Sequence, residues 1–468
     1  MNTGMAGASA QCHLNNSGQS INPDLCFSCM EQTCEDAFTL YQRCISSGVV
    51  EYLQKQAQVR IRRSIYTAQV VIWLMIRQWL QPKGTLATSV EALLAGEADG
   101  LLSGCERAQQ KRISRHTGGY SHARQRLPKR LCWQVMKELV LRLREMLNPG
   151  GGCPAYLLDG SSLELEASPS LRKAYPPAEN QHGRAHWPVL RIIVVHELET
   201  GLAEEPHWGP MYGTEAVSEQ QLAEKTMDAL APGSILVGDR NFGVFSIAWG
   251  AHQRGLQVVV RLTAARARKL AGGPIAEEGE RPVRWTPSRF DGRRQGGMPE
   301  GASIQGRLIA VRIGQGKSKE WLYLFTTVDL PCEDVLALYG KRWNIETDLR
   351  SLKRTVQLHH IAARNESMME KELLTAIGAY NLVRVVMALA ARRHNLSPRQ
   401  LSFTFVLNVV NASWHRLQSA PDAAAYEREV LRLLDAAAEG VHPKRKRRSF
   451  PRATWHRRHT FPARKEPQ

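Results

Sequence analysis

Two aspartates each stand just after a short apolar run. Asp159 follows the run at 155–158 (AYLL), and Asp239 follows the run at 234–237 (SILV) after one glycine. Runs of this kind are typical of buried strands, and chemistry in an open α/β sheet gathers at the carboxyl ends of its strands. Either aspartate alone could be a turn or helix-cap residue. Two of them in the same position after two strands favour a shared site.

A third carboxylate, Glu346, lies in a long helix predicted over 333–356. Tyr339, Arg342, Glu346 and Lys353 follow a Y-x2-R-x3-E-x6-K spacing. At 100° per residue these four side chains fall within a sector of about 60°. A solvated helix also carries Glu and Lys, but that alternative leaves a tyrosine and an arginine beside the acid unexplained. The apolar residues form a separate stripe that is expected to be buried: Leu338, Ile345, Leu349, Leu352 and Val356.

Three carboxylates beside basic groups suit the cleavage of phosphodiester bonds. That reaction uses one metal ion to activate water or a 3′-hydroxyl and another, about 4 Å away, to stabilise the leaving oxygen. Carboxylate oxygens suit Mg²⁺, and we expect Mn²⁺ to substitute for it. The three acids would therefore be the catalytic residues and hold two Mg²⁺ ions. Arg342, Arg350 and Lys353 would bind the phosphates around the scissile bond.

The net charge also points to nucleic acid. The chain carries 62 Lys and Arg against 44 Asp and Glu, a balance of +18, which is typical of proteins that bind a polyanion. The basic run at 444–448 (KRKRR) could simply be solvated, but basic residues are also dense at 60–63, 111–115 and 341–354. Double-stranded DNA is therefore the expected partner.

The longest apolar runs, such as 70–76, are far shorter than the roughly 20 residues that a bilayer requires, so we expect no membrane span. Nine unevenly spaced cysteines and the lack of a secretory pattern favour a cytoplasmic protein. Whether Cys26, Cys29, Cys34 and Cys44 bind zinc stays open, because scattered thiols are often just buried.

Strand-type runs at 155–158, 189–196, 234–237 and 258–262 surround a helical stretch at 219–230, which predicts an α/β core with a mixed sheet flanked by helices. The region before it is helical throughout, and Arg112, Arg115, Arg124 and Arg126 are candidate phosphate contacts there. The predicted divisions are a disordered lead-in (1–24), a helical DNA-binding domain (25–150), the catalytic core in two parts (151–262 and 321–415), a β-rich insertion between them (263–320) and a C-terminal region with a basic tail (416–468).

The helix pattern resembles that of the DDE transposases of the insertion-sequence-four group, and the segments Leu158-Asp159-Gly160-Ser161 and Gly238-Asp239-Arg240-Asn241-Phe242 fit the group's aspartate motifs. The resemblance spans roughly residues 110–410. It implies a ribonuclease-H-like catalytic core with a β-rich insertion between the second aspartate and the glutamate. It also implies cut-and-paste transposition in a bacterial, nucleoid-associated protein, by a homodimer that binds paired transposon ends and target DNA.

Several relatives in this group pass through a DNA hairpin with a flipped base stacked on a tryptophan. Trp321 stands where the resemblance would place that tryptophan, and Tyr339 would contact a nearby phosphate. A tryptophan packed in the core at the start of a strand is the alternative.

Two other functions use the same fold. A nuclease would share the three acids but would cut without joining strands. A catalytically inactive regulator descended from a transposase would bind DNA alone, and it would have no chemical reason to retain all three acids and the helix pattern.

Overall fold

The structure is a computed structural model, and it describes residues 36–59, 65–102, 104–110, 112–148, 153–180, 183–289, 291, 298–314 and 320–443. Several parts of the sequence-based prediction lie outside these residues. They are the lead-in at 1–24, the cysteines Cys26, Cys29 and Cys34, and the basic runs at 60–63 and 444–448. Cys44, the fourth cysteine of the possible zinc set, is described and is buried.

Before β1 (Ala155–Leu158), the described residues form helices and no strands. The long helix α8 begins two residues earlier than expected, and its inward residues Val135, Leu139 and Leu143 recur every fourth position and are all buried. Thr67 caps α3 by accepting a hydrogen bond from the backbone N–H of Val70. The helices are α1 (Ala37–Cys44), α2 (Ser47–Gln56), α3 (Ala68–Leu80), α4 (Leu86–Leu94), α5 (Asp99–Leu102), α6 (Glu106–Gln109), α7 (Gly118–Arg126) and α8 (Lys129–Leu147).

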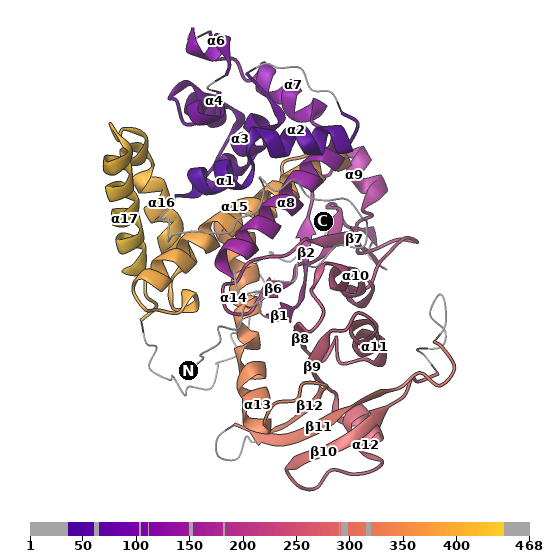
Figure 1. The fold of residues 1–468 in the computed structure, drawn as a ribbon. Coiled ribbons are helices and arrows are strands. Elements are labelled where there is room, and N and C mark those ends of the chain that lie inside the picture. The colour runs from indigo at the N-terminus through magenta and orange to yellow at the C-terminus, as the bar shows by residue number, and fades with distance from the viewer. Residues whose placement is uncertain are drawn as a thin grey trace, which may run out of the picture.

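These helices share one hydrophobic core with helices from the end of the described chain. Helix α15 (Glu366–Arg393) contacts both α3 and α8, and it is followed by α16 (Phe403–Gln418) and α17 (Ala423–Ala438) (Figure 1). By length and composition α15 could span a membrane, but its apolar stretch is 94% buried inside the protein, so it is a core helix. That residues 25–150 form a DNA-binding domain of their own stays a prediction.

Seven of the described strands form one mixed sheet in the order β10-β11-β12-β9-β8-β1-β6. Its centre is parallel: β1 (Ala155–Leu158) pairs with β8 (Ile235–Gly238), and β8 pairs with β9 (Gln257–Arg261). β6 (His196–Glu197), at one edge of the sheet, runs antiparallel to β1, and β12 (Glu320–Thr326), on the other side of the parallel strands, runs antiparallel to β9. The mixed α/β architecture is therefore confirmed.

Both faces of the central strands are buried by helices, which explains their unbroken apolar sequences. Leu157 and Val237 face α13 (Cys332–Gly340) and α14 (Asn344–Arg350). The alternate residues Tyr156 and Leu158 face the opposite layer. That layer contains α10 (Glu219–Thr226), the 3₁₀ turn η2 (Met227–Ala229), α11 (Phe245–Gln253) and α12 (Ala264–Ala271). Figure 1 shows α13 and α14 on one side of these strands and α10 and α11 on the other.

The run predicted as one strand at 189–196 is divided between two sheets, so that prediction was wrong in detail. β5 (Val189–Ile193) lies in a three-stranded sheet between β2 (Gly160–Glu164) and β7 (His207–Pro210), whereas β6 joins the main sheet beside β1. Residues 194–195, both buried, link the two. A short helix, α9 (Pro169–Ala174), and the hairpin strands β3 (Glu179–Asn180) and β4 (Gly183–Arg184) lie between β2 and β5.

Between β9 and β12 the chain forms α12 and two long strands, β10 (Gly279–Trp285) and β11 (Ile304–Ile313). These strands pair antiparallel with each other and β11 pairs with β12, so they extend the main sheet at one edge. Residues 290 and 292–297 and residues 315–319 are outside the described part. That 263–320 is a β-rich insertion between two parts of the catalytic core stays a prediction.

Candidate active site

Strand register brings Asp159 and Asp239 together. Leu158 and Gly238 are paired neighbours at the carboxyl ends of the parallel strands β1 and β8, and each aspartate is the next residue. Side chains alternate along a strand, so both aspartates point to the face that carries Leu157 and Val237. This is the face covered by α13 and α14.

The aspartate pair is partly removed from water. Burial raises the pKa of Asp159 to about 6, a hydrogen bond from the backbone N–H of Gly160 opposes that rise, and the charge of Asp239 adds to it. Asp239 accepts a hydrogen bond of 2.8 Å from the backbone N–H of Asn241. Two desolvated carboxylates side by side repel each other unless a cation lies between them. The chemistry of this pair therefore fits a divalent metal ion.

The predicted helix over 333–356 is continuous but irregular, so its description as one regular α-helix was wrong. A 3₁₀ turn, η5 (Lys341–Trp343), separates α13 from α14, and a π-helical segment, η6 (Ser351–Thr355), follows α14. The Ser351 hydroxyl donates to the carbonyl of Thr347, and the Val356 N–H bonds to the carbonyl of Ser351 instead of the usual acceptor. The predicted apolar stripe still packs on the sheet through Ile345 and Leu349.

Glu346 is held by an arginine of its own helix. The guanidinium of Arg342 lies 3.4 Å from the Glu346 carboxylate, and its charge also lowers the pKa of Asp159. Arg342 is thus near both Glu346 and the aspartate pair. Among the residues that the structure describes, no three Asp, Glu, His or Cys side chains are close enough to hold a metal ion. The two aspartates are brought together, whereas Glu346 is paired with Arg342 instead.

Lys353 ties the helix to the strand that follows Asp159. Its ammonium donates to the Ser161 hydroxyl (3.1 Å) and to the Ser162 carbonyl (2.8 Å), and burial lowers the pKa of Lys353. The wider turn of the π-helical segment contains Lys353. Arg350 is exposed at the surface beside it.

The remaining predicted contacts are less accessible. Tyr339 is nearly buried, and burial raises the pKa of its phenol, which interacts with Arg261 at the end of β9. Trp321 lies in β12 and packs partly against the core beside Tyr323 (ring centroids 5.7 Å apart). The Arg312 guanidinium lies over the Trp321 ring at 4.8 Å. Stacking of a DNA base on Trp321 would therefore require Arg312 to move.

A buried acid that sequence reasoning missed anchors the helix. Asp348 is fully buried, and it forms ion pairs with Arg384 of α15 and with Arg399 (2.6 and 2.7 Å) in the 3₁₀ turn η8 (Pro398–Gln400). Burial alone would raise the pKa of Asp348, but the two arginines outweigh burial and hold it below its usual range. An isolated Asp two residues after Glu346 gives no sequence signal of this role, since both partners are distant in the chain.

Arg124 was a candidate phosphate contact and does not fit that role. Its guanidinium is largely buried and pairs with Glu372 of α15 at 2.6 Å. Arg112, Arg115 and Arg126 are exposed, so they stay candidates. Arg124 is less exposed than the other three arginines because it faces the shared helical core.

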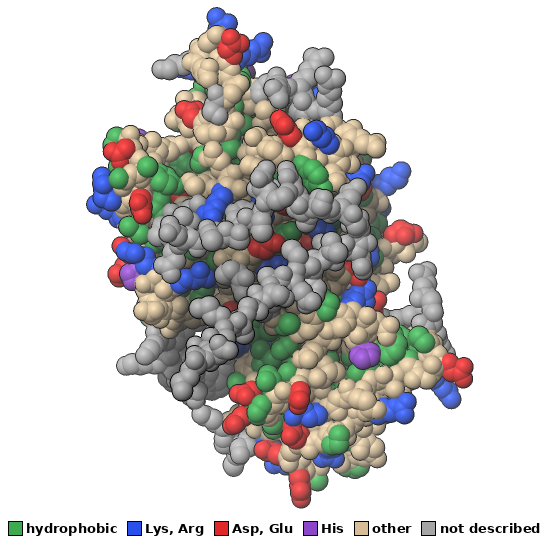
Figure 2. Space-filling model, in the orientation of Figure 1, with side chains coloured by type: hydrophobic (Ala, Val, Ile, Leu, Met, Phe, Trp, Pro, Cys, Tyr) green, Lys and Arg blue, Asp and Glu red, His purple; other side chains and the backbone are tan. Residues whose placement is uncertain are grey.

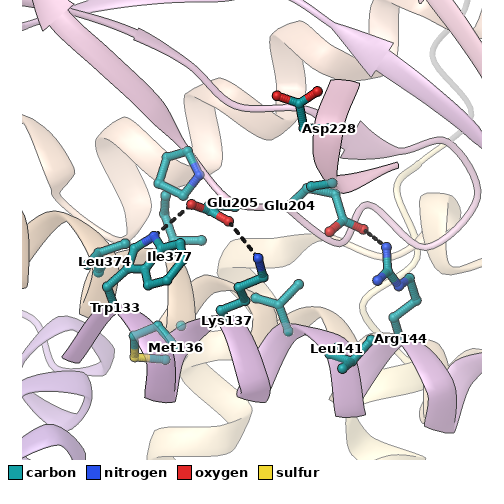
Figure 3. Close-up of a pocket in the computed structure, with 14 residues that line it drawn as sticks. Trp133, Met136, Lys137, Leu141, Arg144, Glu204, Glu205, Asp228, Leu374 and Ile377 are labelled. Carbon is teal, nitrogen blue, oxygen red and sulfur yellow. Dashed lines mark hydrogen bonds and ion pairs between the residues drawn. The ribbon is translucent and has the colours of Figure 1, made fainter. Parts of the chain in front are cut away.

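A cavity of about 270 Å³ lies elsewhere, between α8, the segment before β7 and α15, and none of the predicted site residues lines it. Figure 3 shows Glu205 between Trp133 and Lys137, and Glu204 facing Arg144. Glu205 accepts from the Trp133 indole at 2.6 Å, and Glu204 pairs with Arg144 at 3.0 Å. Because its acids already have partners, this cavity offers no comparable cation site.

Comparison with known proteins identifies a family that this chain matches. The model of the family described as "Transposase DDE domain" matches residues 152–382, a range that contains Asp159, Asp239 and Glu346. The chain is also similar to "Transposase InsG for insertion sequence element IS4" from Escherichia coli (strain K12), with 25% identity over 88% of this chain and 90% of the relative. The chain belongs to the DDE transposases of the insertion-sequence-four group. As a transposase it acts on DNA, and the resemblance seen in its helix pattern is confirmed.

The charge of this transposase is mixed over the described residues of the face that Figure 2 shows. Figure 2 shows Lys and Arg side chains interspersed with Asp and Glu side chains on the face in view. Residues 444–468 contain ten Lys or Arg and one Glu, so they supply +9 of the net +18. Half of the excess positive charge therefore belongs to this C-terminal segment, which lies outside the described residues.

Proposed function

We propose that this transposase binds the terminal inverted repeats of an insertion sequence, cleaves the DNA at those ends and joins them to target DNA. Asp159, Asp239 and Glu346 are the proposed catalytic residues. The observation that carries the proposal is the register-matched aspartate pair, which is partly desolvated and lies on the sheet face that the helix of Glu346 covers. Family membership supports DNA cleavage and strand transfer as the type of reaction.

The three carboxylates would hold two Mg²⁺ ions, or Mn²⁺ in their place. When bound, these ions would activate the attacking oxygen and stabilise the leaving one. The protein's own part is to keep the two aspartates on one face and partly away from water. It must also release Glu346 from Arg342 so that the third carboxylate can join the pair.

DNA itself would bring about that release. A phosphate is a strong bidentate partner for a guanidinium, so a bound DNA end would compete with Glu346 for Arg342. Arg350 is exposed for a second phosphate, and Lys353 would hold a third while keeping its bond to the Ser162 carbonyl. Tyr339 would reach a phosphate from its nearly buried position beside Arg261.

The further parts of the proposal follow from the family. They are a homodimer on paired ends in the bacterial cytoplasm, and a hairpin intermediate with a flipped base on Trp321. The hairpin step would require Arg312 to leave the ring of Trp321.

The test is an assay with Mg²⁺, a plasmid target and DNA that carries the element's own ends, comparing the wild type with Glu346→Ala. End cleavage with joined products, both lost in the variant, is the expected result. Cleavage without joining would identify a nuclease, and binding without cleavage would identify a regulator.

A further inference from the structure

The first turn of α10 lies against both aspartate loops. The half-buried side chain of Glu219 covers Gly160, the residue after Asp159: a Cβ added at position 160 would lie 2.6 Å from the Glu219 carboxyl carbon and from Oε1. Such a contact is closer than real Cβ atoms tolerate, so the position needs a glycine if Glu219 keeps its place. Glu219 therefore contacts the loop of the first aspartate.

The same carboxylate also reaches the loop of the second aspartate. The Asn241 side-chain Nδ2 donates to Glu219 Oε2 at 2.5 Å, and the Asn241 backbone N–H donates to Asp239 Oδ1 at 2.8 Å. The next residue of α10, Gln220, donates from Nε2 to the Asn241 carbonyl at 2.8 Å. Asn241 is thus fixed at its side chain and its main chain, and it in turn fixes Asp239.

An acid in the first turn of a helix often needs no special explanation, because it interacts favourably with the helix dipole. Glu333 in the first turn of α13 is such a residue and is exposed. Glu219 differs, since it bridges two loops that are 80 residues apart (239 − 159) and forms no ion pair with a Lys, Arg or His among the described residues. A carboxylate beside two others without a basic partner is electrostatically unfavourable, so its place calls for another reason.

We propose that Glu219 is a positioning residue of the active site, which acts through Asn241 to hold the Asp159 and Asp239 loops at a fixed separation. The proposal rests on the proposed function, because it assigns the two aspartates to catalysis. Catalytic groups that are misplaced by about 1 Å can lose about 100-fold in rate, so a rigid bridge between the two loops matters for cleavage.

The test uses two readouts on the full chain. The first is amide hydrogen exchange in the peptides around 159–162 and 239–243, and the second is the single-turnover rate of end cleavage at saturating Mg²⁺. Glu219→Ala is expected to speed exchange in both peptides by at least about 10-fold and to slow cleavage by about 10- to 100-fold, without weakening DNA binding. Glu219→Gln keeps an oxygen that accepts from Asn241, so it should stay within about 3-fold of the wild type in both readouts.

Asn241→Ala and the double variant complete the design. If Glu219 acts through Asn241, the double variant is no worse than either single variant, since both remove one connection. Glu333→Ala is the matched control and should change neither readout. Unchanged exchange in Glu219→Ala, multiplied losses in the double variant, or a Glu219→Gln variant as impaired as Glu219→Ala would each overturn the proposal. Faster exchange in Glu219→Ala with a wild type that cleaves no DNA would support the positioning role and overturn the proposed function.

Discussion

The acids of the active site are held in two different ways. Asp159 and Asp239 follow paired residues of neighbouring parallel strands, so main-chain register alone puts them side by side. Glu346 lies on an irregular helix, and its place depends on side chains: Arg342 pairs with it, while Asp348 anchors the helix to Arg384 and Arg399. The backbone therefore fixes the positions of the two aspartates, whereas the Glu346 side chain must leave Arg342 to join them.

The aspartate pair and the Glu346 helix also differ in their electrostatics. The aspartates face each other without a neutralising ion pair among the described residues, and burial raises the pKa of Asp159 to about 6. Asp348 is more deeply buried, yet two arginines hold its pKa below the usual range. The unpaired charges of Asp159 and Asp239 therefore lower the stability of the fold while keeping negative charge at the proposed reaction site. The ion pairs of Asp348 instead stabilise the position of the helix.

Replacing any of the three acids by its amide should have the largest effect. Asp159→Asn, Asp239→Asn and Glu346→Gln should each slow single-turnover cleavage by at least about 1,000-fold, because metal-assisted stabilisation is worth several kcal/mol. DNA binding in a mobility-shift assay should change by less than about 3-fold. The comparison predicts a further difference: without DNA, the two aspartate variants should lose Mn²⁺ affinity, and Glu346→Gln should not. Equal losses in all three would show that Glu346 is already part of the metal site before DNA binds.

Asp348→Asn should have the next largest effect, on stability. Removing its charge leaves Arg384 buried without a full partner, which costs about 3–5 kcal/mol of unfolding free energy. The pKa of Asp348 is lowered on folding, so the stabilisation is present above the unfolded value near pH 4 and is lost as the pH falls through the lower folded value. The measurement is urea unfolding at several pH values. Asp435→Asn removes an exposed pair with Arg393 and should cost less than about 1 kcal/mol; an equal loss in both variants would contradict the anchoring role.

Asp159→Asn should increase the free energy of unfolding, by less than Asp348→Asn decreases it. The pKa of Asp159 is raised on folding, so its contribution is present below about pH 4 and is lost as the pH rises through about 6. Without divalent ions, the variant should therefore be more stable than the wild type by on the order of 1–2 kcal/mol at pH 7.5, and equally stable near pH 4. Adding Mn²⁺ should stabilise the wild type more than the variant. A less stable variant at pH 7.5 without metal would mean that the aspartate pair is not strained.

Arg350→Ala should have the smallest effect. Its side chain is exposed, and losing one phosphate contact should weaken DNA binding by roughly 3- to 5-fold and lower the slope of log K against log salt by about 1. Arg432→Ala on α17, which is exposed and pairs with Glu429, is the control and should leave the slope unchanged. A slope that does not change in Arg350→Ala would remove it from the DNA contacts.

The aspartate pair could be predicted from sequence better than the shape of the Glu346 helix, because local sequence determines the first and distant contacts determine the second. Strand periodicity and the position of each aspartate after its strand depend on neighbouring residues, so the location and common face of Asp159 and Asp239 could be predicted. The helix pattern placed Arg342 beside Glu346, and the structure has them 3.4 Å apart. Local periodicity could not reveal the 3₁₀ and π segments, which depend on Ser351 and on distant packing.

The missed residues share one property: their partners are far away in the chain. Asp348 binds Arg399 across 51 residues, and Glu219 binds Asn241 across 22. The split between β5 and β6 also escaped sequence reasoning, because an apolar run has the same appearance whether it serves one sheet or two. Asn241 stood in the second aspartate motif, but only the fold shows that α10 holds it.

The most direct test is to locate Mn²⁺ by anomalous scattering in crystals of the wild type bound to a DNA end. The DNA end is supplied already cleaved, so that the active wild type with Mn²⁺ leaves it unchanged. The account predicts two manganese sites about 4 Å apart, bound by Asp159, Asp239 and Glu346, with Arg342 moved from Glu346 to a DNA phosphate. Manganese bound elsewhere, or bound by the aspartates while Glu346 stays paired with Arg342, would contradict it.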